Sequence, residues 1–63
     1  MKRSEWVKRC AKRIVALTGD SWGLARAQAQ SCADEQCEIN GASGAAWTAP
    51  EEAADEMVEG AEE

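Results

Sequence analysis

The most reactive side chains in this sequence are three cysteines, Cys10, Cys32 and Cys37. Thiolates hold structural zinc when four Cys, His or carboxylate ligands meet in a tetrahedral arrangement. The chain has no His and no fourth Cys, and the four residues between Cys32 and Cys37 make a loose spacing for a zinc pair. The pattern favours inert free thiols and no bound metal or cofactor. A regulatory Cys32–Cys37 or Cys10–Cys32 disulfide, or a metal site, remains an alternative.

Charged side chains are the second group of candidate functional residues, because positive and negative charges are separated along the chain. Six of the seven Lys and Arg residues lie within the first 13 positions, whereas residues 34–63 carry ten Asp or Glu and no Lys or Arg. The net charge is therefore +5 for residues 1–33 and −10 for residues 34–63. This split indicates either partners of opposite charge or internal complementarity between a basic and an acidic helix.

Three amphipathic helices are expected to position these groups, because the chain is rich in Ala, Glu, Gln and Arg and contains no Phe or Tyr. Apolar residues recur at helical spacing over about 5–18, 21–34 and 49–60, and the apolar face expected for the first helix includes Leu17. Turn signals predict a Gly-rich loop over 36–47, and residues 61–63 are expected to be mobile. The prediction is an all-α, three-helix domain that spans residues 1–63.

Capping signals mark the expected ends of these helices. A side-chain oxygen just before a helix accepts hydrogen bonds from its free amides, and a glycine just after it adopts the left-handed conformation. The expected N-caps are Ser4, then Asp20 or Ser21, then Thr48 in a capping box with Glu51, while Gly19 ends the first helix and Pro50 fits the first turn of the third.

The bulky part of the core must come mainly from tryptophan. We expect Trp6 and Trp22 to be buried, because a small domain can bury two indoles but seldom three. Ile39 and Trp47 are expected to fasten the loop to the core. Trp47 is then the best candidate for a half-exposed anchor of the kind found in binding hot spots.

The segment Pro50-Glu51-Glu52-Ala53-Ala54-Asp55-Glu56, which follows an N-terminal segment with Trp6 and Arg13, resembles a group of short bacterial and prophage-borne proteins. Those proteins also end in a Pro-Glu-x-Ala-Ala-Asp-type acidic helix. The resemblance covers about a third of the chain. It implies a small accessory protein of a mobile element and no particular chemistry, since the group has no assigned activity.

Several classes of function are disfavoured by the same residues. No apolar run approaches the roughly 20 residues that span a bilayer, and no apolar segment follows the basic start, so a cytoplasmic protein without a membrane partner is expected. Sixty-three residues leave little room for an enclosed substrate pocket. The sequence shows no nucleophile–base pair, and it lacks histidine, the commonest general base. We therefore predict that the chain is not an enzyme.

The remaining interpretation is a small accessory or adaptor protein that binds another protein, with a homodimer possible. Its expected interaction residues are Trp47, Glu52, Asp55, Glu56 and Glu59. The alternative is a nucleic-acid-binding regulator that uses Lys8, Arg9, Lys12 and Arg13 on the basic face of the first helix. If the first and third helices are neighbours, pairs such as Arg13 with Asp55 would instead join those two faces.

Overall fold

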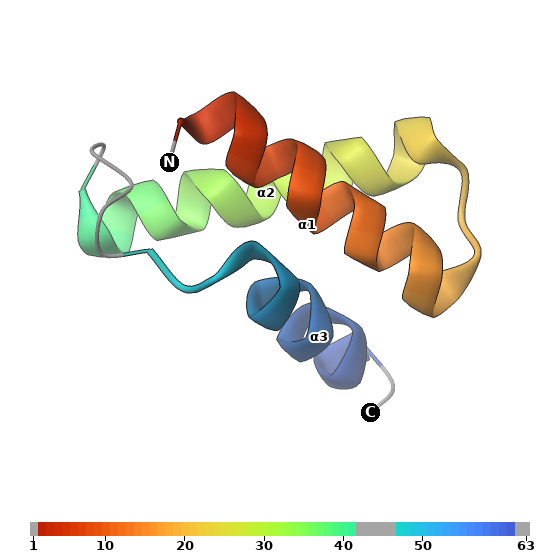
Figure 1. The fold of residues 1–63 in the computed structure, drawn as a ribbon. Coiled ribbons are helices and arrows are strands. Elements are labelled where there is room, and N and C mark those ends of the chain that lie inside the picture. The colour runs from red at the N-terminus through yellow and green to blue at the C-terminus, as the bar shows by residue number, and fades with distance from the viewer. Residues whose placement is uncertain (1, 42–46, 62–63) are drawn as a thin grey trace.

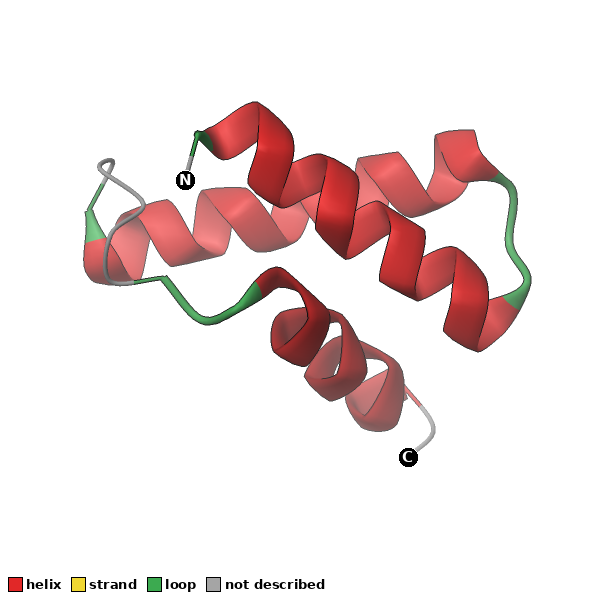
Figure 2. Cartoon of the chain, viewed as in Figure 1, coloured by secondary structure: helices red, strands yellow, loops and turns green. Residues whose placement is uncertain are grey.

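Three α-helices in the order α1 (Arg3–Thr18), α2 (Trp22–Asn40) and α3 (Pro50–Ala61) form the protein in the computed structural model, which describes residues 2–41 and 47–61. Both α2 and α3 pack against α1, which lies between them (Figure 1). Figure 2 shows the short loop that joins α1 to α2. The predicted all-α, three-helix architecture is confirmed.

The first helix begins earlier than its capping pattern predicts. Lys2 holds the N-cap position without a side-chain hydrogen bond, and the Trp6 amide already donates to the Lys2 carbonyl at 3.0 Å. Ser4 therefore lies inside the first turn, and its assignment as the cap is wrong. The predicted end is confirmed: Gly19 has a φ of 75°, and its amide donates to the Val15 carbonyl at 2.8 Å.

The second helix begins where one of its two candidate caps predicts and ends later than expected. Ser21 is the cap, and its Oγ accepts a hydrogen bond from the Leu24 amide at 3.4 Å. The helix continues to Asn40 because residues 35–40 contain neither Gly nor Pro, and it stops at Gly41, whose φ is 87°. The predicted end near residue 34 and the loop over residues 36–40 are wrong. Part of the remaining loop, residues 42–46, lies outside the described residues.

The third helix begins at Pro50, one residue later than predicted. The Ala53 amide donates to the Ala49 carbonyl, so Ala49 and not Thr48 stands directly before the helix. Thr48 uses its backbone instead: its carbonyl accepts from Trp6 Nε1 at 2.9 Å, and its amide donates to Gln36 Oε1 at 3.2 Å. At the far end Ala61 is still helical, and residues 62–63 of the predicted mobile tail lie outside the described residues.

The core depends on small residues that let the helices approach closely. Five buried side chains belong to α1, while α2 and α3 contribute alanines. The buried apolar residues are Trp6, Val7, Cys10, Ala11, Ile14, Ala25, Ala29, Ala33, Ala53 and Ala54. Alanines on α2 and α3 bring those helices against α1 but cover little of its apolar surface. Bulky residues at the edges of the core therefore stay partly open to solvent.

Two tryptophans and one isoleucine test the predicted core. Trp6 is 2% exposed as predicted, and Trp47 packs edge-on against it with ring centroids 5.4 Å apart. Trp22 is 44% exposed and Ile39 is 70% exposed, so both predictions of core positions are wrong. Trp22 is the first residue of α2, at the margin of its contact with α1. Ile39 lies in the part of α2 that the sequence assigned to a loop.

Candidate functional site

Two cations on the basic face of α1 form ion pairs with α3. Arg9 donates to Glu51 Oε1 at 2.8 Å, and Arg13 donates to Asp55 Oδ1 at 2.9 Å, which confirms the predicted Arg13–Asp55 pair. The hydrogen bond to Asp55 is the main cause that raises the pKa of Arg13. These pairs are solvent-exposed, so they orient α3 along α1 more than they stabilise it.

The other two predicted nucleic-acid contacts remain available. Lys8 and Lys12 are exposed, and neither takes part in an ion pair among the described residues. The structure therefore does not present the four predicted cations as one row. Two of them already neutralise acids of the same chain, and only two could still bind phosphate groups.

The predicted acidic contacts on α3 also differ in whether they form an ion pair within the chain. Asp55 is half-buried and bonded to Arg13, whereas Glu52, Glu56 and Glu59 are exposed. These three carboxylates, the "outer carboxylates" below, recur at steps of four and three and so share one side of α3. They form no ion pair among the described residues. Three of the four predicted acidic contacts are thus placed to meet a partner.

Trp47 occupies a different environment from the other predicted contacts. It is half-buried, its ring packs on Trp6, and its Nε1 donates to the Gly41 carbonyl at 2.7 Å. Both its apolar face and its polar atom are therefore engaged within the chain. Its geometry gives it a structural role, which is to close the core between the end of α2 and the start of α3.

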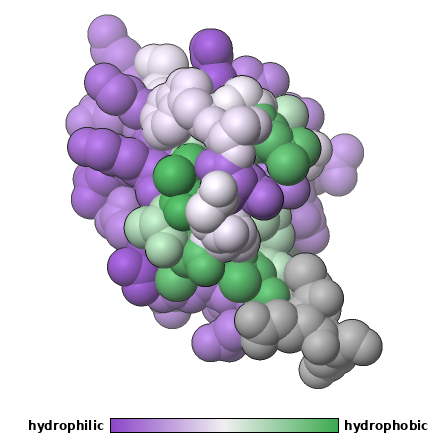
Figure 3. All heavy atoms as spheres, turned by 90° about the vertical axis from the view of Figure 1, so that its right-hand side faces the viewer, coloured by the Kyte–Doolittle hydropathy of each residue, from purple (hydrophilic) through white to green (hydrophobic). Residues whose placement is uncertain are grey.

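Apolar residues gather at the end of the molecule where α1 ends and α2 begins. Leu17 is 42% exposed and Leu24 is 50% exposed, on either side of the short turn between these helices. Figure 3 faces this end and shows hydrophobic atoms in several groups around a near-neutral and hydrophilic centre, with hydrophilic residues at the margin. The "apolar end" below comprises Leu17 and Leu24.

Sequence reasoning missed the apolar end because it assigned Leu17 to the buried stripe of the first helix. The helical phase of Leu17 is compatible with that stripe, but the partner helices supply mainly alanines at their contacts with α1. The structure shows the reason, because α2 buries no residue larger than Ala. A leucine at the margin of such a contact cannot be fully covered.

The sulfur atoms meet across the three helices. Cys10 is fully buried, Cys32 is half-buried, and the Cys32 thiol donates to Met57 Sδ at 3.5 Å. A hydrogen bond from Cys10 lowers the pKa of Cys32 to about 7, against opposing effects of burial and the Glu35 charge. The same hydrogen bond and the burial of Cys10 raise the pKa of Cys10. All three cysteines are free thiols, and within residues 2–41 and 47–61 no three Cys, Asp or Glu side chains converge as a metal site.

We predict that Cys32 alkylates with a pH midpoint near 7 in a Cys37→Ser variant, because the thiolate is the nucleophile. Cys10 should stay unmodified until the protein is unfolded in urea, since it is buried. Iodoacetamide labelling from pH 5 to 9, followed by mass spectrometry of the peptides, measures both rates. A Cys32 midpoint near 9, or equal labelling of Cys10 and Cys32 in the folded protein, would contradict the arrangement.

No known protein family, curated protein or solved structure matches this chain. The resemblance of the segment that begins at Pro50 to short prophage-borne proteins stays a prediction. None of the helices among the described residues is long and apolar enough to cross a bilayer.

Proposed function

We propose that this protein is a small accessory protein without enzymatic activity that binds another protein through its apolar end. The observation that carries the proposal is the exposure of Leu17 and Leu24, 42% and 50%, at one end of a chain with few large apolar residues. An exposed group of large apolar side chains inside a polar rim is typical of a protein-binding surface.

The charge on α3 indicates the kind of partner. Glu56 and Glu59 are exposed on the last turns of α3, and residues 27–61 contain no Lys or Arg. Carboxylates at an interface rim select partners whose rim is basic and speed their association. The partner proposed is therefore a protein that presents an apolar patch bordered by Lys or Arg.

The size of the molecule limits where such an interface can lie. A stable interface covers about 800 Å² on each partner. That is about a fifth of the 4115 Å² of accessible surface of this chain. Two leucines cannot provide this area alone, so the interface would continue along the outer carboxylates of α3. The ion pairs of α3 with Arg9 and Arg13 support this geometry, because they hold α3 beside α1.

Site-specific photocrosslinking tests the proposal. A benzophenone side chain at position 24 should crosslink a partner protein in the native cell, and the linked peptide should contain Lys or Arg. The same group at position 27 is the matched control, since Ala27 is exposed on α2 but lies outside the apolar end. Equal crosslinking from both positions, or none from position 24, would refute the assignment. Crosslinks only to a second copy would replace it with self-association.

A further inference from the structure

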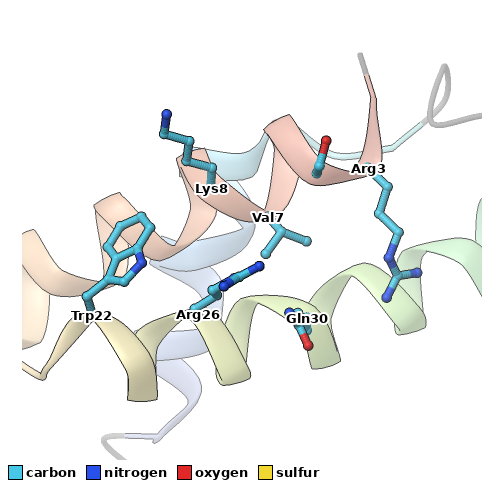
Figure 4. A pocket seen from close by; sticks show the side chains of 7 residues that line it. Arg3, Val7, Lys8, Trp22, Arg26 and Gln30 are labelled. Atoms are coloured by element: carbon cyan, nitrogen blue, oxygen red, sulfur yellow. The ribbon is translucent and has the colours of Figure 1, made fainter.

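A groove runs between α1 and α2 and uses none of the residues of the apolar end (Figure 4). Its volume is about 560 Å³, which falls within the range of small-molecule sites. Arg3, Ser4, Val7 and Lys8 line it from α1, and Trp22, Arg26 and Gln30 line it from α2.

The spacing of the α2 residues makes the groove elongated. Trp22, Arg26 and Gln30 recur every four residues and so form one row along the helix. At a rise of about 1.5 Å per residue, this row spans about 12 Å. Val7, which is 6% exposed, supplies apolar surface between the walls. The groove is therefore long and narrow, with different chemistry at its two ends.

The lining is cationic and contains no acid. Arg3 already donates to Asp34 Oδ1 at 2.5 Å at one end of the groove. Neither Lys8 nor Arg26 takes part in an ion pair among the described residues. In Figure 4 Arg26 lies along the groove from the α2 wall, whereas the Lys8 side chain starts at the α1 wall and extends away from α2. An anionic group in the groove would meet Arg26 directly, and rotation of the exposed Lys8 side chain would bring a second cation to it.

Trp22 adds an aromatic face to this cationic site. It is 44% exposed, which is unusual for the largest apolar side chain in so small a protein. The other two indoles donate their N–H groups to backbone carbonyls, of Thr48 and Gly41, whereas Trp22 donates no hydrogen bond among the described residues. Trp22 is therefore the one indole of the three whose ring and N–H are both open to a ligand.

We infer that this groove binds a free nucleoside monophosphate, with the base stacked on Trp22 and the phosphate between Lys8 and Arg26. Aromatic faces stack on any base, and Lys and Arg bind phosphate through charge-assisted hydrogen bonds. The Gln30 amide can donate and accept hydrogen bonds with the sugar or base.

The charge of the whole chain favours a mononucleotide over a nucleic-acid strand. Residues 34–63 carry a net charge of −10, which repels an extended row of phosphates. A single phosphate within the groove meets only the local cations. This site goes beyond the proposed protein-binding function, because it involves neither the apolar end nor the outer carboxylates.

The test is titration of the ¹⁵N-labelled protein with adenosine 5′-monophosphate, observed at the three indole N–H signals. The Trp22 signal should shift and saturate, while the signals of Trp6 and Trp47 stay in place. Arg26→Gln and Lys8→Gln should each weaken binding about tenfold. Trp22→Leu should weaken binding of the nucleotide and leave any binding of inorganic phosphate unchanged.

Lys12→Gln is the matched control, because it removes the same charge from the exposed side of α1 outside the groove. Its affinity should equal that of the wild type. Equal weakening by Lys12→Gln and Lys8→Gln, equal affinity for adenosine and its monophosphate, or no saturation at millimolar nucleotide would overturn the inference. Tighter, strongly salt-dependent binding of a single-stranded oligonucleotide would also overturn it and assign the groove to nucleic acid.

Discussion

Trp6→Ala is expected to cost about 3 to 5 kcal/mol of folding free energy, the typical loss for removing a buried tryptophan. A chain of this length has roughly 3 to 9 kcal/mol in total, so the variant should lose at least about a third of its stability and would be unfolded at 25 °C if the total lies near the lower value. Trp6 is 2% exposed, packs edge-on against Trp47 and donates its indole N–H to the Thr48 carbonyl. It therefore joins α1 to the segment that leads into α3.

Trp22→Ala is the matched control for that experiment, because it removes the same side chain from a position that is 44% exposed. Its cost should be well below that of Trp6→Ala. Trp6→Phe should lie between the two, since it keeps a ring in the core and loses the hydrogen bond to Thr48, at a cost of about 1 to 3 kcal/mol. Urea unfolding followed by far-ultraviolet circular dichroism measures all three. Equal losses for the Trp6→Ala and Trp22→Ala variants would contradict the packing.

Ala29→Leu should destabilise the protein by about 1 to 3 kcal/mol through overpacking. Ala29 is fully buried, within the row of alanines through which α2 contacts α1, so three additional carbon atoms must force the helices apart. The matched control is Ala27→Leu on the exposed side of α2, which should change stability by less than about 0.5 kcal/mol. Thermal unfolding of both variants tests the contact. A neutral Ala29→Leu substitution would mean that α1 and α2 do not approach as described.

The fold class follows from the sequence because its strongest local signals agree with one another. Gly19 and Ser21 act where the chain must turn, one in the left-handed conformation and the other as a cap. The end of the second helix was less predictable. Four of the six residues in 35–40 are polar, and polarity alone does not separate an exposed helical turn from a loop. The first residue that cannot continue an ordinary helix is Gly41.

The identity of the exposed large side chains could not be predicted from helical phase. Phase gives the side of a helix on which a residue lies, but not how far the neighbouring helix extends along that side. Trp22 and Leu17 both lie near the margins of helix contacts and are exposed, although the pattern placed both in the core. The residues of the groove and of the apolar end can therefore be identified only from the three-dimensional packing of the helices.

The separation of charge along the chain has a partly internal explanation. Arg3, Arg9 and Arg13 pair with Asp34, Glu51 and Asp55, so the basic helix binds acids from both other helices. This is the internal complementarity that the charge pattern offered as one of two interpretations. The charges outside these pairs include Lys8, Lys12 and Arg26 on α1 and α2, and the outer carboxylates on α3. They leave two separate charged surfaces for partners.

The most direct test of the proposed function is native mass spectrometry of the protein from a cell lysate at low and moderate salt. The double variant Leu17→Asp, Leu24→Asp is compared with Ala16→Asp, Ala27→Asp, which adds the same charges at exposed positions of the same helices. Circular dichroism confirms that both are folded. We expect a complex heavier than the monomer in the wild type and in the alanine-site variant. We expect this complex to be absent in the leucine-site variant. A wild-type protein that is monomeric at every salt concentration, or a complex that survives the leucine substitutions, would contradict the proposed function.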